Sequence, residues 1–320
     1  MGVLDSGINL SLPPFAALTD PVIATIAPPL VFWATSLTFH AFDEFKLFQK
    51  YKLIPEDEAS KRNIAKKSEV VKSVLTQHAI QTSLGILALQ WEDEAPPLDD
   101  PLGLTGWLMR RLIDDNPAAQ QSRILSFLFY FAILLARQVT AFVIYDTWQY
   151  WVHWFGHVNT WAYRNVHSRH HRLYVPYAFG ALYSHPLEGF FLDTLGGWVS
   201  YQMLGLTHRE RAVFFTVSTV KTVDDHCGYE FPWDPIIWLG HITGSEMVYH
   251  TIHHQPWGIK TNYGLFFTFW DDIMNTRYRG TRNVGEVKRK VEREAPPPPP
   301  EKLDEALEAT AVATGVQIRS

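Results

Sequence analysis

Histidine is the residue type whose spacing in this chain is best suited to chemistry. Twelve of the 14 histidines fall between His153 and His254. One HxxxH pair and two HxxHH triplets repeat the spacing at which side chains share one helix face, with Cβ atoms about 5–6 Å apart. These clusters are His153 and His157; His167, His170 and His171; and His250, His253 and His254. The imidazoles of one cluster can therefore converge on one metal ion or on two neighbouring ions, and the isolated His226 could complete the set.

The number of these histidines predicts two metal ions. A zinc ion takes about four ligands, so nine candidates, the clustered histidines together with His226, are too many for one ion and suit two. Imidazole also binds copper, iron and nickel, and the spacing does not distinguish iron from zinc. The single cysteine, Cys227, excludes an intrachain disulfide and a multi-cysteine zinc site. The chain has no HExxH motif, so a metalloprotease would lack its general base.

Residues beside the clusters are candidates for supporting roles. Asp224 and Asp225 directly precede His226, and carboxylates commonly orient metal-bound imidazoles through a hydrogen bond. The alternative for these two residues is a solvated acidic turn. His185, which is followed by Glu188, is a candidate tenth ligand, a hydrogen-bond partner of a ligand, or an ordinary hydrogen-bonded histidine.

Long apolar stretches precede the histidine clusters and must position them. Residues 22–42 carry no formal charge and are long enough, at about 1.5 Å per residue, to cross a hydrocarbon core of about 30 Å. Residues 73–91 form a weaker stretch with several polar side chains, and residues 124–145 form a third. Each stretch predicts a transmembrane helix. For the first stretch, a buried helix of a soluble protein is the alternative.

Two more apolar stretches, residues 187–206 and 212–220, flank a polar break at residues 207–211. This pattern predicts a membrane hairpin over residues 187–223 that enters and leaves on the same side. Arg137 and Asp193 are ionisable residues inside apolar stretches, where a functional role is the default interpretation. They are predicted to pair with each other or to bind the polar head of a substrate, unless Arg137 only marks the cytosolic end of its span.

The distribution of basic residues predicts the orientation in the membrane. The linker over residues 43–72 holds eight Lys and Arg residues, whereas the linker over residues 92–123 is mainly acidic. Cytosolic loops are enriched in Lys and Arg, so we expect the first linker in the cytosol and the second in the lumen. The third span then returns the chain to the cytosol near Tyr145, which places every histidine cluster on the cytosolic side.

Together these features predict an all-α integral membrane protein with about four transmembrane helices, one option being a re-entrant hairpin, capped by a cytosolic, histidine-rich helical di-metal domain. Residues 1–145 would hold the first spans and linkers, and residues 146–283 the catalytic region with the 187–223 hairpin. Residues 284–320 are rich in Pro, Glu and Ala and are predicted to be a disordered tail. The net charge of −5 provides no basic field for nucleic acid.

The order of the clusters after hydrophobic spans resembles the fatty acid hydroxylase/sterol desaturase superfamily. Within it, the strings at residues 146–150, 167–183, 221–229 and 258–262 are most similar to the fungal sphinganine C4-hydroxylases. The resemblance implies a multi-pass enzyme of the endoplasmic reticulum membrane that hydroxylates C4 of sphinganine or dihydroceramide. It also implies two irons, O2, and electrons delivered from NAD(P)H through cytochrome b5 and its reductase on the cytosolic face.

Carried over to this chain, the resemblance implies nine metal ligands. They are His153, His157, His167, His170, His171, His226, His250, His253 and His254. Related fatty acid 2-hydroxylases pair the histidine equivalent to His226 with another four residues earlier, and Thr222 occupies that position here. The ligand set is therefore one short, or His185 substitutes.

Other functions remain open from the sequence. One is a different lipid oxidation of the same superfamily, such as sterol desaturation or fatty acid 2-hydroxylation. A second class is a non-catalytic membrane protein that transports metal or carries bis-histidine haem, and a third is a membrane zinc hydrolase. A transporter should place its ligands within the spans, whereas the clusters here follow them.

Overall fold

The computed structural model describes residues 19–55, 61–89, 108 and 110–294. The regular elements of this part are all helical, and its only strand-like pairings are two isolated bridges. The elements are α1 Asp20–Glu44, η3 Gln49–Tyr51, α3 Lys67–Leu89, η4 Arg110–Asp114, α5 Pro117–Gln121, α6 Arg123–Val158, α7 Thr160–Asn165, η5 His167–Arg172, η6 Ala178–Gly180, α8 Pro186–Gly189, η7 Phe190–Leu195, α9 Gly196–Leu204, α10 His208–Cys227, α11 Pro235–Thr243, α12 Met247–His254, α13 Phe269–Ile273 and α14 Val284–Arg293. The elements η4 and η7 are π-helical, and the other η elements are 3₁₀ turns.

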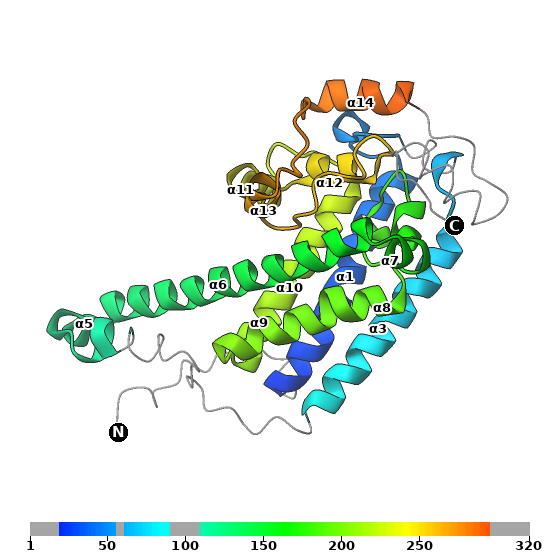
Figure 1. Ribbon diagram of the computed structural model, residues 1–320. Helices are drawn as coiled ribbons and strands as arrows, with labels where there is room; N and C mark the ends of the chain where they lie inside the picture. Colours follow the sequence, from blue (N-terminus) through cyan, green and yellow to red (C-terminus); the bar gives the residue numbers. More distant parts are fainter. Residues whose placement is uncertain (1–18, 56–60, 90–107, 109, 295–320) are drawn as a thin grey trace.

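Two helices, α1 and α6, are long and apolar enough to cross a membrane. In each, only 17% of the most apolar window is buried inside the protein. The first half of α6 extends away from the other helices (Figure 1), and Ile124, Phe127 and Phe131 on it are each more than half exposed. A soluble protein rarely exposes so large an apolar surface. These exposed apolar faces indicate a membrane protein, and the alternative of a buried soluble helix for the first stretch is wrong, because most of its apolar window is not buried.

Helix α6 differs from its prediction in length. The expected span ended at Tyr145, but the helix continues without a break to Val158. Ser122 caps its start by accepting a hydrogen bond from the backbone N–H of Leu125, and the helix ends where Asn159 takes an extended conformation and caps α7. One continuous helix thus carries both an apolar span and the first histidine pair.

The other predicted spans are confirmed only as helical segments. Helix α3 covers most of residues 73–91 and is long enough to cross a membrane, but it is too polar to be a candidate span. In the hairpin, the chain turns at Gly205, in a left-handed conformation with φ 56°, and α10 begins at His208 with a capping box between Thr207 and Glu210. The first leg is divided into α8, η7 and α9, and neither leg qualifies as a span. Within the described residues the structure supports two candidate spans rather than four.

The core joins the membrane helices to the histidine-bearing region. Helix α1 packs along α10 (Figure 1), and Phe32 and Phe39 of α1 share one cluster of buried side chains with Val223 of α10. Helix α1 remains helical through Pro28 and Pro29. Because α10 ends at the histidine site and α1 runs beside it, the buried apolar surface between them holds the site against the spans.

The basic linker after α1 lies at the same end of the molecule as the histidines. The backbone N–H of Leu53 donates to the carbonyl of Gly228, and that of Ile64 donates to the carbonyl of Arg172. Leu53 is fully buried in a cluster with Ile252 of α12. The linker is therefore part of the histidine-rich domain rather than a separate loop.

The disordered tail was predicted to begin at residue 284, but the first ten residues of that segment are helical. Residues 284–293 form α14, which is capped by Asn283 and buries Val287 and Val291. The linker provides their partners: both valines pack with Leu53, and Arg62 donates to the carbonyl of Val291. Two apolar residues one turn apart are too weak a pattern to predict a packed helix without knowledge of that surface. The rest of the predicted tail, residues 295–320, and most of the acidic linker lie outside the described residues.

Candidate metal centre

Four elements bring the histidines together. The last turns of α6 carry His153 and His157, η5 carries the first HxxHH triplet, α12 carries the second, and His226 lies at the end of α10. Gly156 lets η5 approach α6 closely, because a Cβ at that position would lie 3.3 Å from Cγ of His167. The first triplet forms a 3₁₀ turn, not the α-helix that its spacing suggested.

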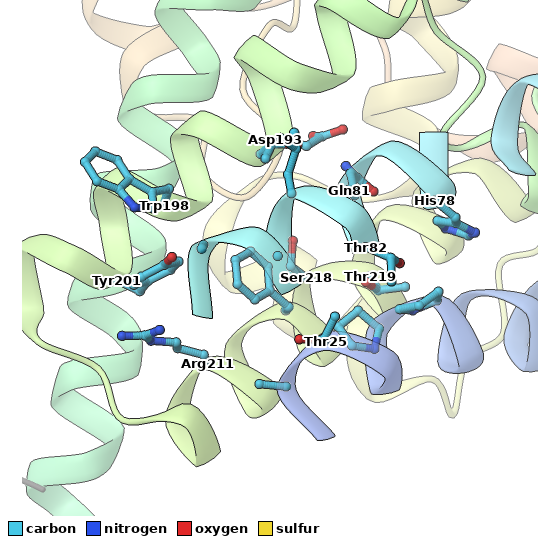
Figure 2. Close-up of a pocket in the computed structure, with 18 of the residues that line it drawn as sticks. Thr25, His78, Gln81, Thr82, Asp193, Trp198, Tyr201, Arg211, Ser218 and Thr219 are labelled. Carbon is cyan, nitrogen blue, oxygen red and sulfur yellow. The ribbon is translucent and has the colours of Figure 1, made fainter. Parts of the chain in front are cut away.

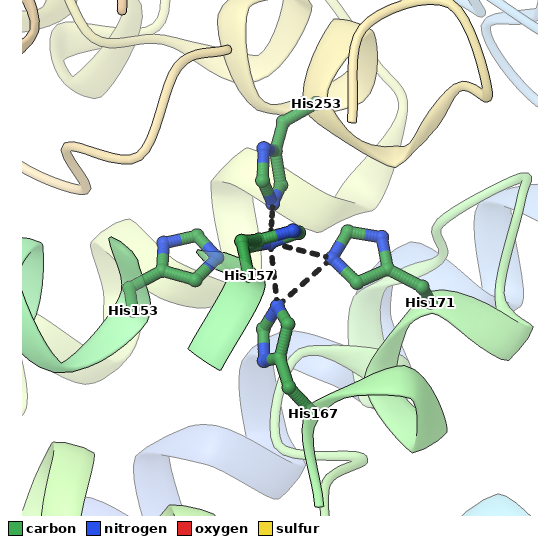
Figure 3. Close-up of side chains that lie close together, drawn as sticks. All are labelled: His153, His157, His167, His171 and His253. Carbon is green, nitrogen blue, oxygen red and sulfur yellow. Dashed lines mark hydrogen bonds between the residues drawn. The ribbon is translucent and has the colours of Figure 1, made fainter. Parts of the chain in front are cut away.

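The first group contains five histidines (Figure 3): His153, His157, His167, His171 and His253. One ring nitrogen from each lies within 4.8 Å of the others. The Nε2 atom of His157 lies 2.7 Å from Nε2 of His167 and 3.2 Å from Nε2 of both His171 and His253. All are buried except His157, which is partly exposed. We call this set the five-histidine group.

The second group contains four buried histidines: His170, His226, His250 and His254. The Nε2 atom of His250 lies 3.0 Å from Nε2 of His226 and 3.1 Å from Nε2 of His254. The two groups are adjacent, because the ring centroids of His171 and His254 are only 5.1 Å apart. We call this set the four-histidine group.

Each HxxHH triplet supplies both groups. In η5, the i and i+4 residues His167 and His171 join the five-histidine group, while His170 points to the four-histidine group. In α12 the assignment is reversed: the i and i+4 residues belong to the four-histidine group, and His253 belongs to the other. The structure thus gathers all nine predicted histidines into two sets and shows that a triplet is not a set by itself.

Hydrogen bonds at Nδ1 determine which ring nitrogen is available. Five of the nine rings bond through Nδ1 to a backbone carbonyl, at 2.7–3.0 Å. The pairs are His153 with Tyr263, His170 with Tyr183, His226 with Thr222, His253 with Thr261 and His254 with Leu173. A carbonyl only accepts, so Nδ1 carries the proton and Nε2 of the neutral ring presents a lone pair.

The converging lone pairs fit metal ions. In the four-histidine group, Nε2 of both His226 and His254 is unprotonated, and a single proton on His250 could satisfy only one of them. Burial lowers the pKa of His167 and of His226 to about 3, so these rings are neutral at pH 7. Buried lone pairs facing one another are costly unless a cation sits between them. The donor set is all imidazole, which suits iron, zinc and copper.

Among the residues that the structure describes, Glu188 supplies the one carboxylate that bonds directly to a clustered ring. Its Oε1 atom lies 2.5 Å from Nδ1 of His167, and both side chains are buried. This arrangement orients the ring and increases the basicity of its other nitrogen. From the sequence, Glu188 was noted only as a neighbour of His185, and its contact with His167 was not predicted. A carboxylate close to an unassigned histidine was the available signal, but it could not identify the ring that the carboxylate contacts.

The predicted supporting residues have other roles. Asp225 accepts two hydrogen bonds from Lys221, and Asp224 lies beside Cys227. Both aspartates are buried, so the solvated turn is wrong, and neither bonds to an imidazole. They face away from the rings because they precede His226 by one and two residues, a spacing that does not share a helix face. His185 is in neither group and caps α8, where its Nδ1 accepts from the backbone N–H of Leu187.

Two buried aspartates hold the loop that supplies carbonyl partners to the five-histidine group. Asp271 accepts from the backbone N–H groups of Tyr263 and Gly264. Asp146, on α6, accepts from the three N–H groups of residues 265–267. These contacts place the carbonyl of Tyr263 against His153, two turns after Asp146 on the same helix. Nothing in the sequence marked either aspartate for this role.

Two cavities lie beside the histidine groups. The first, of about 460 Å³, lies among α1, α3, η7, α9 and α10 (Figure 2) and is lined by Arg211 at one end of α10 and by Thr222, one turn before His226, at the other. The second, of about 890 Å³, lies between α6 and the η7–α9 segment, and its wall includes His153 and His167. Both have mainly apolar walls, which suits a lipid chain.

Comparisons with known proteins agree with this arrangement. A model of the fatty acid hydroxylase family matches residues 138–276. The chain is 41% identical to a sphingolipid C4-hydroxylase of Saccharomyces cerevisiae over 278 residues, which cover 86% of this chain and 76% of the yeast protein. It is 38% identical to sphinganine C4-monooxygenase 1 of Arabidopsis thaliana over 262 residues, or 81% of this chain and 88% of the plant protein. It is also 34% identical to the very-long-chain aldehyde decarbonylase GL1-9 of Oryza sativa subsp. indica over 260 residues, or 81% and 89%. No solved structure matches the chain significantly.

Proposed function

Because the chain belongs to the fatty acid hydroxylase family, we propose that it is a sphingolipid C4-hydroxylase that converts sphinganine or dihydroceramide to the 4-hydroxylated product. The observation that carries this proposal is the pair of buried histidine groups beside apolar cavities large enough for a long alkyl chain. The two relatives named for C4 oxidation, which match over four fifths of the chain or more, support the choice of reaction.

Two iron ions are the metals that we propose for the histidine groups. Bound there, they would supply, with O2 and two electrons, the oxidising power that an unactivated methylene requires and that side chains alone lack. The ligands would be the five histidines of the first group and the four of the second. The four-histidine group would therefore have one ligand fewer than the five-histidine group. Thr222, at the position where related enzymes have a histidine, contributes only a backbone carbonyl that bonds to Nδ1 of His226.

The protein itself positions the substrate and excludes water. The apolar walls of the cavities bind the alkyl chain, and the buried rings lie where bulk water has little access. Carbonyls and Glu188 hold six of the nine rings in one orientation, so each Nε2 faces its group before substrate arrives. Such preorganisation reduces the rearrangement that the reaction requires.

We further propose that the histidine domain faces the cytosol at the endoplasmic reticulum membrane and receives electrons from NAD(P)H through cytochrome b5 and its reductase. The basic linker supports this orientation, because it packs against the histidine domain and positive charge favours the cytosolic side. The continuous α6 supports it too, since it carries an apolar span directly into the site. Cysteine-labelling accessibility of the linker in sealed microsomes tests this orientation, and labelling only after permeabilisation contradicts it.

The test is the long-chain-base profile of cells that lack 4-hydroxylated bases, with this chain expressed in them. We expect 4-hydroxylated bases by mass spectrometry, and we expect them to disappear in His170→Ala and in His253→Ala. The matched control is His241→Ala, because His241 is exposed on α11 and belongs to neither group. All three variants should insert into the membrane as the unaltered protein does.

The alternatives give different products in the same experiment. Altered sterols or new alkanes with an unchanged base profile would replace C4-hydroxylation by sterol oxidation or by aldehyde decarbonylation. A 2-hydroxylated fatty acid would indicate the acyl chain as the oxidised position. With purified protein, activity that requires iron, O2 and reductant distinguishes an oxygenase from a zinc hydrolase, and a strong visible absorption band would identify a haem carrier.

A further inference from the structure

Asp193 is a carboxylate in the wall of the 460 Å³ cavity that has neutral partners only. Its Oδ1 atom lies 3.3 Å from Nε2 of Gln149, and the hydroxyl of Tyr145 donates to it. Ser218, on the opposite wall, donates in turn to that hydroxyl. Within the described residues Asp193 has no cationic partner, because the arginine predicted to pair with it bonds elsewhere. Arg137 pairs with Glu210 at 2.6 Å.

Two independent paths place Asp193 next to the five-histidine group. Its partner Gln149 lies on α6, one turn before His153. Along its own segment, Asp193 follows Glu188 by five residues, and Glu188 bonds to His167. One α-helical turn advances about 5.4 Å. Asp193, which lines the cavity and is labelled at the top of Figure 2, is therefore within about one turn of residues that belong to or contact the five-histidine group.

The shape of the cavity determines how a long-chain base would lie in it. The cavity follows α10 from Arg211 to Thr222, roughly 16 Å at about 1.5 Å per residue. Phe32, Leu84 and Phe215 contribute apolar wall along this length. The alkyl tail fits toward Arg211, and the polar head then lies at the Asp193 end, nearest the histidines.

The covalent structure of the substrate matches this placement. A free long-chain base carries an ammonium group on C2, two bonds from C4. An ammonium nitrogen about 2.8 Å from a carboxylate oxygen forms a charge-assisted hydrogen bond. Three further bonds of about 1.5 Å each, from nitrogen to C2, C2 to C3 and C3 to C4, separate the nitrogen from C4. C4 therefore lies within roughly 7 Å of the Asp193 carboxylate. That reach is similar to one turn of α6, so C4 can face the five-histidine group while the ammonium is bound.

We propose that Asp193 binds the protonated amino group of a free long-chain base and makes the enzyme select free bases over N-acylated ones. An amide nitrogen carries no charge, so a ceramide would offer the buried Asp193 no counter-charge and no charge-assisted hydrogen bond. Glu188, the other carboxylate nearby, is already engaged by His167. This inference rests on the proposed function for its substrate but concerns a different property, the charge of the group that is recognised.

The experiment compares Asp193→Asn with the unaltered enzyme on sphinganine and on N-acetylsphinganine. Asparagine keeps the size of the side chain and removes its charge. We expect KM for sphinganine to rise about 30-fold or more, as for the loss of one member of a buried charge pair, and KM for N-acetylsphinganine to change less than threefold. Asp193→Glu should retain the preference for the free base. The matched control is Asp272→Asn, which removes the charge of an exposed aspartate paired with Arg277 and should change neither constant.

A binding measurement separates this proposal from the proposed function. Calorimetry with the purified enzyme should show that octadecylamine binds at least tenfold more tightly than 1-octadecanol, and that Asp193→Asn removes the difference. Equal binding of amine and alcohol, or an unchanged KM for sphinganine in a folded Asp193→Asn protein, overturns the role of Asp193. If neither sphinganine nor N-acetylsphinganine is hydroxylated while octadecylamine still binds through Asp193, the C4-hydroxylase assignment fails and the ammonium site stands.

Discussion

The carboxylate of Glu188 should control metal affinity mainly in one histidine group. It bonds to Nδ1 of His167, a ring of the five-histidine group, and to no ring of the other group. Glutamine at this position could still accept the hydrogen bond, but without the charge. A hydrogen bond to a charged group contributes about 1.5–3 kcal/mol and a neutral one about 0.5–1.5 kcal/mol. The loss is therefore about 1–1.5 kcal/mol, or roughly tenfold in affinity.

Alanine at the same position should have a larger effect. It removes the acceptor and leaves Nδ1 of a buried ring without a partner, since both side chains of the pair are less than a tenth exposed. Loss of such a supporting group typically reduces metal affinity by 10- to 100-fold. We therefore expect Glu188→Ala near the upper end of that range and Glu188→Gln near the lower.

The assay is competition between purified, iron-loaded protein and a ferrous chelator under anaerobic conditions. In Glu188→Ala, one equivalent of iron should leave at a chelator concentration well below that needed for the other. Glu44→Gln is the matched control, because Glu44 is exposed, pairs with Lys67 and belongs to neither histidine group. Equal weakening of both equivalents, or no change with alanine, would refute the assignment of Glu188 to one metal.

Three other outcomes follow from the contacts. His170→Ala and His171→Ala alter adjacent residues that belong to different histidine groups. Iron should be lost mainly from the four-histidine group in His170→Ala and mainly from the five-histidine group in His171→Ala. Identical curves of iron release to the chelator in the two variants would contradict the division into two groups. Arg137→Met should lower the free energy of unfolding by about 3–5 kcal/mol, because Glu210 is left buried without its charged partner. The double variant Arg137→Met/Glu210→Met should recover part of this stability. An unchanged thermal-unfolding midpoint in Arg137→Met would refute the prediction. Gly258→Ala should lower both the unfolding midpoint and the iron content, since the added Cβ would lie 2.0 Å from the carbonyl oxygen of Ile252 in α12; full iron content would show that α12 adapts without displacing its histidines.

Much of the membrane architecture was predictable because apolar length is a local property. The stretches at residues 22–42 and 124–145 both form helices long enough to span, as uninterrupted hydropathy indicates. The continuation of α6 past Tyr145 was not predicted, because polar residues end an apolar stretch but do not end a helix. The hairpin is helical as expected, yet its first leg is broken by the π-helical segment η7. Sequence periodicity does not reveal such a break.

Packing between distant segments decided the roles of the charged residues. Pairing of Arg137 with Asp193 was one of the alternatives that the sequence left open, and the structure instead pairs Arg137 with Glu210 at the start of α10. This correction leaves Asp193 in the cavity wall with neutral partners, which is the basis of the proposed ammonium site. Helix α14 likewise depends on distant segments, since Val287 and Val291 are buried in one cluster with Leu53 of the linker and Ile252 of α12.

The sequence alone identified the eight clustered histidines as candidates to come together, because their spacing is a local property, whereas His226 and His185 were left open. It could not determine how they divide. Whether His170 belongs with His171 or with His254 depends on where α10 and α12 pass relative to η5, and that is set by packing across more than 80 residues of chain. The same holds for the carbonyls and for Glu188, which fix the ring nitrogens from remote segments. Local periodicity identified most of the candidate ligands, and only the tertiary structure showed how they divide into two groups.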